Sequence, residues 1–130
     1  MKTDDKKRCF GGKPGQDLYA IYHDTEWGVP VHDDQQLFEM LILEGAQAGL
    51  SWETVLKRRI GYRKAFHNFD PYKVSCMTDT ELELLRSNEE SIRNRLKIYA
   101  ARRNAQVFLK YNKSSDHLTI IYGVLSSTLL

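Results

Sequence analysis

Apolar residues recur at the three- and four-residue spacing of an α-helix along most of this 130-residue chain. Residues able to cap a helix stand before three of these runs, at Asp33 or Asp34, at Ser51, and at Thr78 with Glu81. The spacing predicts helices over about 34–49, 52–66, 79–85 and 92–111, with a break at 68–71. We therefore expect an all-α fold that forms one domain over residues 1–130. The last helix is expected to bury Leu96, Tyr99 and Ala100.

The two ends of the chain lack this pattern. Residues 10–32 hold half of the glycines and two of the three prolines, which predicts an ordered but irregular N-terminal layer. Residues 114–130 show no cap and no charge after Asp116, so they are interpreted as a divergent tail. No stretch has the length and apolarity of a membrane span, and no secretory signal stands at the start. With two cysteines only, we expect a cytoplasmic protein without a membrane or an evident protein partner.

The charge is unevenly distributed. Composition, with 42% apolar and 28% charged residues, excludes a disordered chain and a disulfide scaffold, and a net charge of +2 decides no partner. Residues 91–113, however, contain seven cations and no acid. Such a stretch is typical of a face that binds a polyanion, and equally of a solvated helix surface.

Glu44 is the first candidate for chemistry. Its spacing from Leu37, Leu41 and Ala48 places it on the apolar stripe of its helix, where a carboxylate needs a partner or a raised pKa. A structural carboxylate bound by amides or by an arginine explains this position as well as a functional one does. The small residues over 45–49 would let a flat ligand approach, and Trp52 supplies a large π-face.

Two further groups stand in the N-terminal layer. Its aromatic residues are either packing or walls on which a flipped base stacks; they are Phe10, Tyr19, Tyr22 and Trp27. Cys9 and His23 suit zinc, but a structural zinc site needs four ligands and no other residue stands at a recognised spacing. A satisfied loop histidine is the alternative.

Taken together, these segments resemble the DNA-3-methyladenine glycosylase I family. The similarity covers about residues 8–110 and is densest in YAIYHDTEWGVP at 19–30 and LEGAQAGLSW at 43–52. It implies an all-α helix-hairpin-helix glycosylase fold and hydrolysis of the N-glycosidic bond of 3-methyladenine in double-stranded alkylated DNA, as in base-excision repair. It also implies the site residues: Glu44 as the catalytic residue, Tyr19, Tyr22, Trp27 and Trp52 around the base, Arg93, Arg95 and Lys97 on DNA, and Cys9 and His23 as half of a structural zinc site.

The sequence also departs from the family pattern. Phe10 stands where a tryptophan is usual, and Glu90 stands at the glycine of the expected hairpin, where it should strain the turn and repel phosphate. The second pair of zinc ligands is missing, which predicts a C-terminally truncated member with impaired activity. The alternatives are a catalytically inactive remnant that at most binds nucleic acid, and a small metal-binding or partner-binding helical module.

Overall fold

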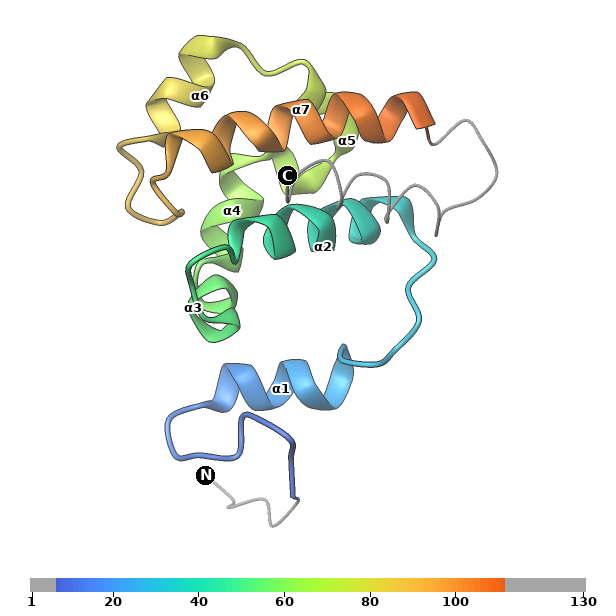
Figure 1. Ribbon diagram of the computed structural model, residues 1–130, viewed down its shortest axis with the longest axis vertical. Helices are drawn as coiled ribbons and strands as arrows, with labels where there is room; N and C mark the ends of the chain where they lie inside the picture. The colour runs from blue at the N-terminus through green and yellow to red at the C-terminus, as the bar shows by residue number, and fades with distance from the viewer. Residues whose placement is uncertain (1–6, 112–130) are drawn as a thin grey trace. The chain divides into compact units, whose positions relative to one another are not determined.

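The computed structural model describes residues 7–111, and these residues fall into two compact units (Figure 1). The N-terminal unit runs to Val31, and the helical unit begins at His32. The expectation of one domain over residues 1–130 stays a prediction, as does the divergence of residues 114–130, which lie outside the described part.

The N-terminal unit is built on one helix, α1 (Asp17–Thr25). The layer was expected to be ordered but irregular, and the sequence pattern did not predict this helix. The glycines and prolines lie on either side of α1 and not within it. Residues before α1 fold back over it. Gly11 (φ +76°) has the position of its absent Cβ within 2.7–2.9 Å of backbone atoms of Tyr19 and Ala20, so only glycine fits this close approach.

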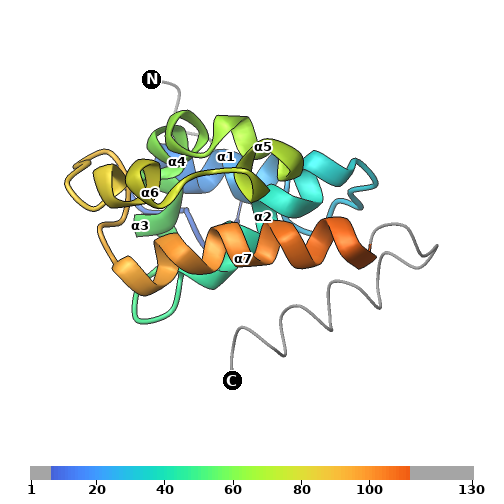
Figure 2. The same ribbon diagram turned by 90° about the horizontal axis from the view of Figure 1, so that it is seen from above.

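The helical unit contains six α-helices and a short 3₁₀ turn among its described residues, and no strand. They are α2 (Asp34–Ala46), α3 (Trp52–Lys57), α4 (Arg59–Ala65), the turn η1 (His67–Phe69), α5 (Pro71–Ser75), α6 (Asp79–Leu85) and α7 (Arg95–Tyr111). Figures 1 and 2 show α7 running alongside α2, with α5 and α6 against α7. The all-α expectation is confirmed over residues 7–111.

The predicted caps form. The side chains of Asp33, Ser51 and Thr78 accept hydrogen bonds from the backbone N–H three residues on, at 3.0, 3.1 and 3.2 Å. The expected helix over 52–66 is interrupted, because Arg58 (φ −94°, ψ −2°) ends α3 and precedes α4. The sequence pattern did not predict α5, which Asp70 caps and Pro71 opens.

One hydrophobic core holds the helical unit together. Its fully buried aromatic side chains are Phe38, Phe66 and Phe69, and burial raises the pKa of the neighbouring Tyr62 hydroxyl to about 12. From α7 the core takes Ile98, Ala101, Ala105 and Phe108. Leu96, expected inside, is 79% exposed, because helix α7 presents the stripe that begins at Ile98 and not the one through Leu96 and Ala100.

The connection between α6 and α7 differs from expectation. Glu90 was expected to strain a turn that requires glycine, but it is not among the residues with positive φ. In the described chain, the non-glycine residues with positive φ are His67, Asn68 and Phe69, and the last of these is fully buried in the core. No helix within residues 7–111 is long and apolar enough to cross a membrane.

Candidate active site

Glu44 lies in the last turn of α2, but not on its buried face. That face carries Phe38, Leu41, Ile42 and Ala46, and Glu44 is exposed. The buried face of α2 that the spacing predicted was displaced by about one residue. One residue corresponds to a rotation of roughly 100° around a helix. The buried carboxylate of α2 is Glu39, which sequence analysis did not single out.

Glu39 has the structural role that was one interpretation of Glu44. It is 7% exposed, and its Oε1 atom accepts hydrogen bonds from Arg59 Nε at 2.5 Å and Arg63 Nη2 at 2.9 Å. Two arginines thus compensate this buried carboxylate. The signal in the sequence was the pair of arginines four residues apart, Arg59 and Arg63, which lie on α4.

Glu44 instead lines a cavity of about 290 Å³ between the end of α2 and the first half of α7. The walls are mostly small or apolar, including Ala48, Leu96 and Ala100, with Asn94 and Asn104 among them. These walls remove part of the water around the Glu44 carboxyl, and this desolvation raises its pKa. The arrangement suits a carboxylate that receives a hydrogen bond from a ligand.

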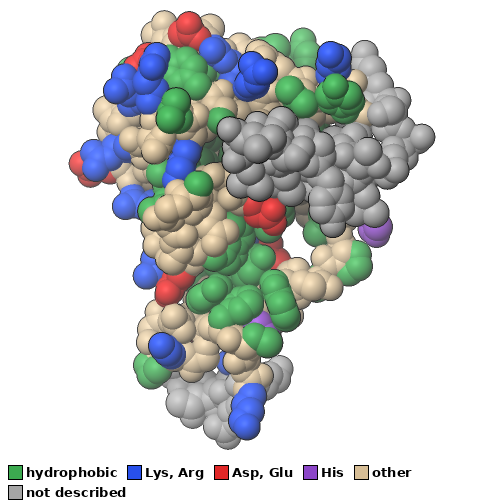
Figure 3. Space-filling model, in the orientation of Figure 1, with side chains coloured by type: hydrophobic (Ala, Val, Ile, Leu, Met, Phe, Trp, Pro, Cys, Tyr) green, Lys and Arg blue, Asp and Glu red, His purple; other side chains and the backbone are tan. Residues whose placement is uncertain are grey.

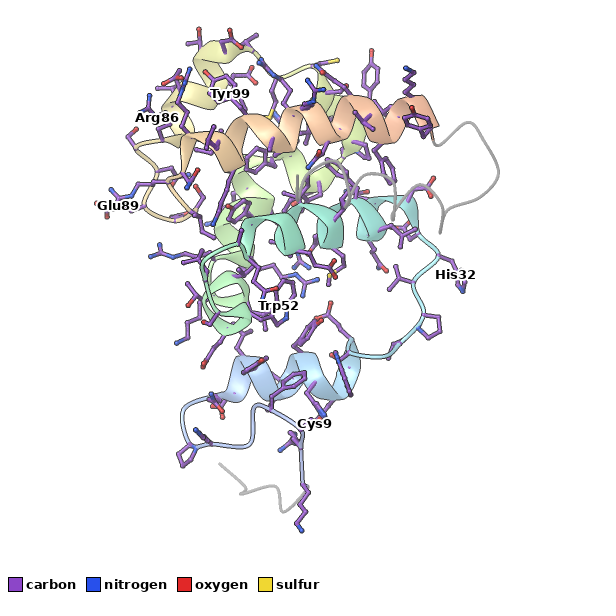
Figure 4. The ribbon with its side chains drawn as sticks, in the orientation of Figure 1. Cys9, His32, Trp52, Arg86, Glu89 and Tyr99 are labelled. Atoms are coloured by element: carbon purple, nitrogen blue, oxygen red, sulfur yellow. The ribbon has the colours of Figure 1, made fainter. Side chains whose placement is uncertain are left out.

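A tight turn joins Glu44 to Trp52. Leu50 N donates to Gln47 O at 2.7 Å, and Gly49 adopts φ +78°, a conformation that favours glycine. Ser51 then caps α3, and Trp52 stands on its first turn, partly buried against the core (Figure 4). The helical unit therefore holds the two candidate residues at opposite ends of one short loop.

The aromatic residues of the N-terminal unit form a cluster. The Phe10 ring stacks on Tyr19 with centroids 4.5 Å apart and meets Trp27 edge-on at 5.5 Å, and Tyr22 lies at 6.2 Å. Phe10 therefore occupies the centre of this cluster. Tyr19, Tyr22 and Trp27 therefore lie around one ring, and Trp27 remains 52% exposed. Their role around a base stays a prediction.

His23 belongs to an ion-paired group in the same unit. The Arg8 guanidinium holds Asp24 with Nε–Oδ1 and Nη2–Oδ2 distances of 2.9 and 2.8 Å, and His23 Nδ1 lies 3.0 Å from Oδ1. The hydrogen bonds from Arg8, then from His23, hold the pKa of Asp24 well below its ordinary range. Asp24 orients the His23 ring, which leaves Nε2 as the nitrogen available to a metal.

The described residues do not complete a zinc site. Cys9 is an exposed free thiol, and no group of three or more His, Cys, Asp or Glu that could hold a metal occurs within residues 7–111. The zinc role of Cys9 and His23 therefore stays a prediction.

The three predicted DNA contacts divide into two kinds. Arg93, two residues before α7, and Arg95, its first residue, are exposed, and Arg95 Nε lies 3.6 Å from Glu83 Oε1. Lys97 is half-buried, and its Nζ donates to the backbone oxygens of Ala46 at 2.8 Å and Ala48 at 2.6 Å. Figure 3 shows Lys and Arg side chains, with acidic side chains between them, along the edge that contains α3, α4 and the start of α7. The basic residues of this edge therefore include some outside the 91–113 stretch.

Comparison with known proteins identifies the family. A sequence profile of the methyladenine glycosylase family matches residues 13–125. The DNA-3-methyladenine glycosylase 1 of Escherichia coli is 50% identical over 111 residues, which are 85% of this chain and 58% of that protein. The Haemophilus influenzae DNA-3-methyladenine glycosylase is 47% identical over 104 residues, 80% of this chain and 56% of the relative. This chain belongs to the methyladenine glycosylase family.

Solved structures agree with the fold. A crystal structure of 3-methyladenine DNA glycosylase I matches with a TM-score of 0.76 and 48% identity, over 82% of this chain and 58% of that one. The Staphylococcus aureus enzyme, solved for its recognition of 3-methyladenine, matches with a TM-score of 0.77, 37% identity, and 82% and 56% coverage. The expected glycosylase fold is confirmed, and the chain spans somewhat more than half the length of these relatives.

Proposed function

We propose that this chain is a DNA glycosylase that releases 3-methyladenine from double-stranded alkylated DNA. The supporting observation is the placement of Glu44 and Trp52 at the two ends of the 47–51 loop, with Glu44 on a cavity wall. A relative of this family, a variant of 3-methyladenine DNA glycosylase I that is 34% identical to this chain, was solved in complex with 3-methyladenine. We place the activity in the cytoplasm, whose reducing conditions suit the free thiols of Cys9 and Cys76.

Charge explains how such a site selects its base. N3-methylation makes adenine in DNA cationic, so a carboxylate and electron-rich rings favour it over neutral adenine. Glu44 would accept a charge-assisted hydrogen bond from the base, worth about 1.5–3 kcal/mol. Stacking on Trp52 would add about 1–3 kcal/mol. The part of Tyr19, Tyr22 and Trp27 in base binding rests on the family resemblance.

The reaction requires little acid catalysis. Once the nucleotide is extruded from the duplex, the electrons of the glycosidic bond pass to the cationic base, which leaves neutral. A water oxygen bonds to the anomeric carbon and releases one proton to solvent. The demands on this chain are therefore extrusion, recognition of the cation, and access for water.

A base-release assay tests the proposal. Methylated double-stranded DNA is incubated with the chain, and free 3-methyladenine is measured by chromatography. We expect release by the unsubstituted chain and a fall of about tenfold or more with Glu44→Gln, the loss of about 1.4 kcal/mol or more. Glu81→Gln, an exposed position on α6, is the matched control. No release by the unsubstituted chain would favour the inactive remnant.

A further inference from the structure

Lys97 makes two hydrogen bonds across a separation of about fifty residues. Its Nζ atom, carried by the first turn of α7, reaches Ala46 O at 2.8 Å and Ala48 O at 2.6 Å. Ala46 is the last residue of α2, and Ala48 lies in the loop that follows. The Lys97 side chain therefore connects α7 to the end of α2 and to the loop after it.

The two carbonyls need such a donor. The last carbonyls of a helix have no partner within the helix, and Leu50 N, which could serve Ala46 O, bonds to Gln47 O at 2.7 Å instead. The last turn of α2 contains no basic residue of its own. A cation from α7 therefore satisfies the negative end of the helix dipole.

The loop itself offers little else to hold it. Residues 45–49, which cover the end of α2 and the start of the 47–51 loop, are Gly, Ala, Gln, Ala and Gly. The glycines give the backbone conformational freedom, and neither they nor the alanines have a polar side chain. On its far side, Ser51 fixes the start of α3. On its near side, Gln47 N donates to Leu43 O and Glu44 O of α2, and Lys97 adds two hydrogen bonds from α7.

We propose that Lys97 is a positioning residue that holds the end of α2 and the 47–51 loop so that Glu44 and Trp52 keep the separation that base binding requires. This inference rests on the proposed function. Lys97 lines the same cavity as Glu44, but its ammonium is directed to backbone oxygens and not to a phosphate. Desolvation lowers the pKa of Lys97, in keeping with a half-buried structural donor.

The positioning role of Lys97 can be tested separately from its contribution to the stability of the fold. The contribution of α7 to the core comes from Ile98, Ala101, Ala105 and Phe108, and none of these contacts depends on the ammonium. Lys97→Met keeps most of the length of the side chain and removes its three donors, whereas Lys97→Arg keeps donors and charge. Lys110→Met, an exposed lysine at the other end of α7, is the matched control.

The first measurement needs no ligand. Amide hydrogen exchange is compared in the folded variants, after thermal unfolding has established that each one folds. We expect Lys97→Met to exchange faster over residues 47–51 with the rest of α7 unchanged, and Lys97→Arg to restore most of the protection. Unchanged amide exchange over residues 47–51 in Lys97→Met would show that Lys97 does not hold this loop.

The second measurement is binding of free 3-methyladenine, followed by tryptophan fluorescence. We expect Lys97→Met to weaken binding about tenfold, which corresponds to about 1.4 kcal/mol, and Lys97→Arg and Lys110→Met to stay within about twofold. Equal affinity of Lys97→Met and the unsubstituted chain would overturn the positioning role. A reduced salt dependence of DNA binding with normal exchange would assign Lys97 to DNA instead.

The two proposals fail in different ways. If the unsubstituted chain binds no 3-methyladenine, the proposed function and the role of Lys97 in base binding are both wrong. Amide hydrogen exchange then still shows whether Lys97 holds the 47–51 loop. If it binds the base and Lys97→Met binds equally well, the proposed function stands and the Lys97 role is wrong.

Discussion

Gly61 of α4 lies directly against the backbone of Glu90. A Cβ at position 61 would stand 2.0 Å from Glu90 O and 2.5 Å from its carbonyl carbon. The Arg58 guanidinium also donates to Glu89 O in the same connection. The segment between α6 and α7 is therefore seated on α4 because position 61 has no side chain.

Gly61→Ala should destabilise the chain, because the added Cβ would meet backbone atoms of Glu90 and not the end of a flexible side chain. Overpacking of this kind costs about 1–3 kcal/mol, which chemical denaturation would measure. Gly45→Ala is the control, since its Cβ would meet nothing within 4 Å and alanine favours a helix interior by about 0.5–1 kcal/mol. Equal stability of the two variants would contradict the close approach.

Glu39→Gln should also destabilise the chain. The amide cannot compensate Arg59 and Arg63, whose nitrogens lie 2.5 and 2.9 Å from the carboxylate, and charge-assisted bonds are worth about 1.5–3 kcal/mol. Solvent screening reduces the contribution of the Arg63 bond to stability, since the Arg63 side chain is 43% exposed. Denaturation of Glu39→Gln beside Glu44→Gln measures the difference. A loss confined to Glu44→Gln would reverse the two assignments.

Glu44 should give base release a pH dependence that Glu44→Gln lacks. Its pKa is raised, so release from alkylated DNA, whose methylated base keeps its charge, should fall as pH drops through a value above the ordinary 4.5. The same shift makes the folded chain hold this proton more tightly than the unfolded one. The stability that it contributes is full below the ordinary value and is lost as pH rises through the raised value.

Two measurements check this. Release rates across pH should show the extra ionisation in the unsubstituted chain only, and at neutral pH Glu44→Gln should be slightly more stable than the unsubstituted chain. Parallel pH profiles for the two proteins would remove Glu44 from recognition of the charged base.

Arg93 and Arg95 should make the phosphate contacts that the cation-rich stretch at 91–113 leads us to expect. Replacing both by alanine should reduce the salt slope of binding by about 1 to 2. The matched pair Arg103→Ala and Lys110→Ala removes two exposed cations from the same stretch. If only the control pair changes the slope, the DNA face lies further along α7. If neither does, the edge with Lys57 and Lys64 becomes the next candidate.

Zinc should be substoichiometric in the purified chain. Cys9 and His23 offer two ligands, and the free energy of a structural site comes from closing a full tetrahedron. Elemental analysis of protein purified with zinc present should find well under one ion per chain, with Cys9→Ser and Cys76→Ser as paired variants. One tightly held zinc that disappears in Cys9→Ser and not in Cys76→Ser would contradict this.

The helical class, the caps and the family could be predicted because they depend on neighbouring residues. A cap is a hydrogen bond over three residues, as Ser51 and Thr78 illustrate, and the motif at 43–52 is read directly from its letters. Spacing fixes a helix well, but it fixes the buried face only to within about one residue. This is why Glu44 was placed on the buried face that Glu39 occupies.

The sequence by itself determined that this chain is helical, that it belongs with the methyladenine glycosylases, and which residues are candidates for chemistry. Only the tertiary structure decided what partners those residues have. The bonds from Lys97 to Ala46 and Ala48, and from Arg59 to Glu39, join helices far apart in sequence. Their energies depend on burial and distance, which exist once the helices have packed, so no local pattern records them.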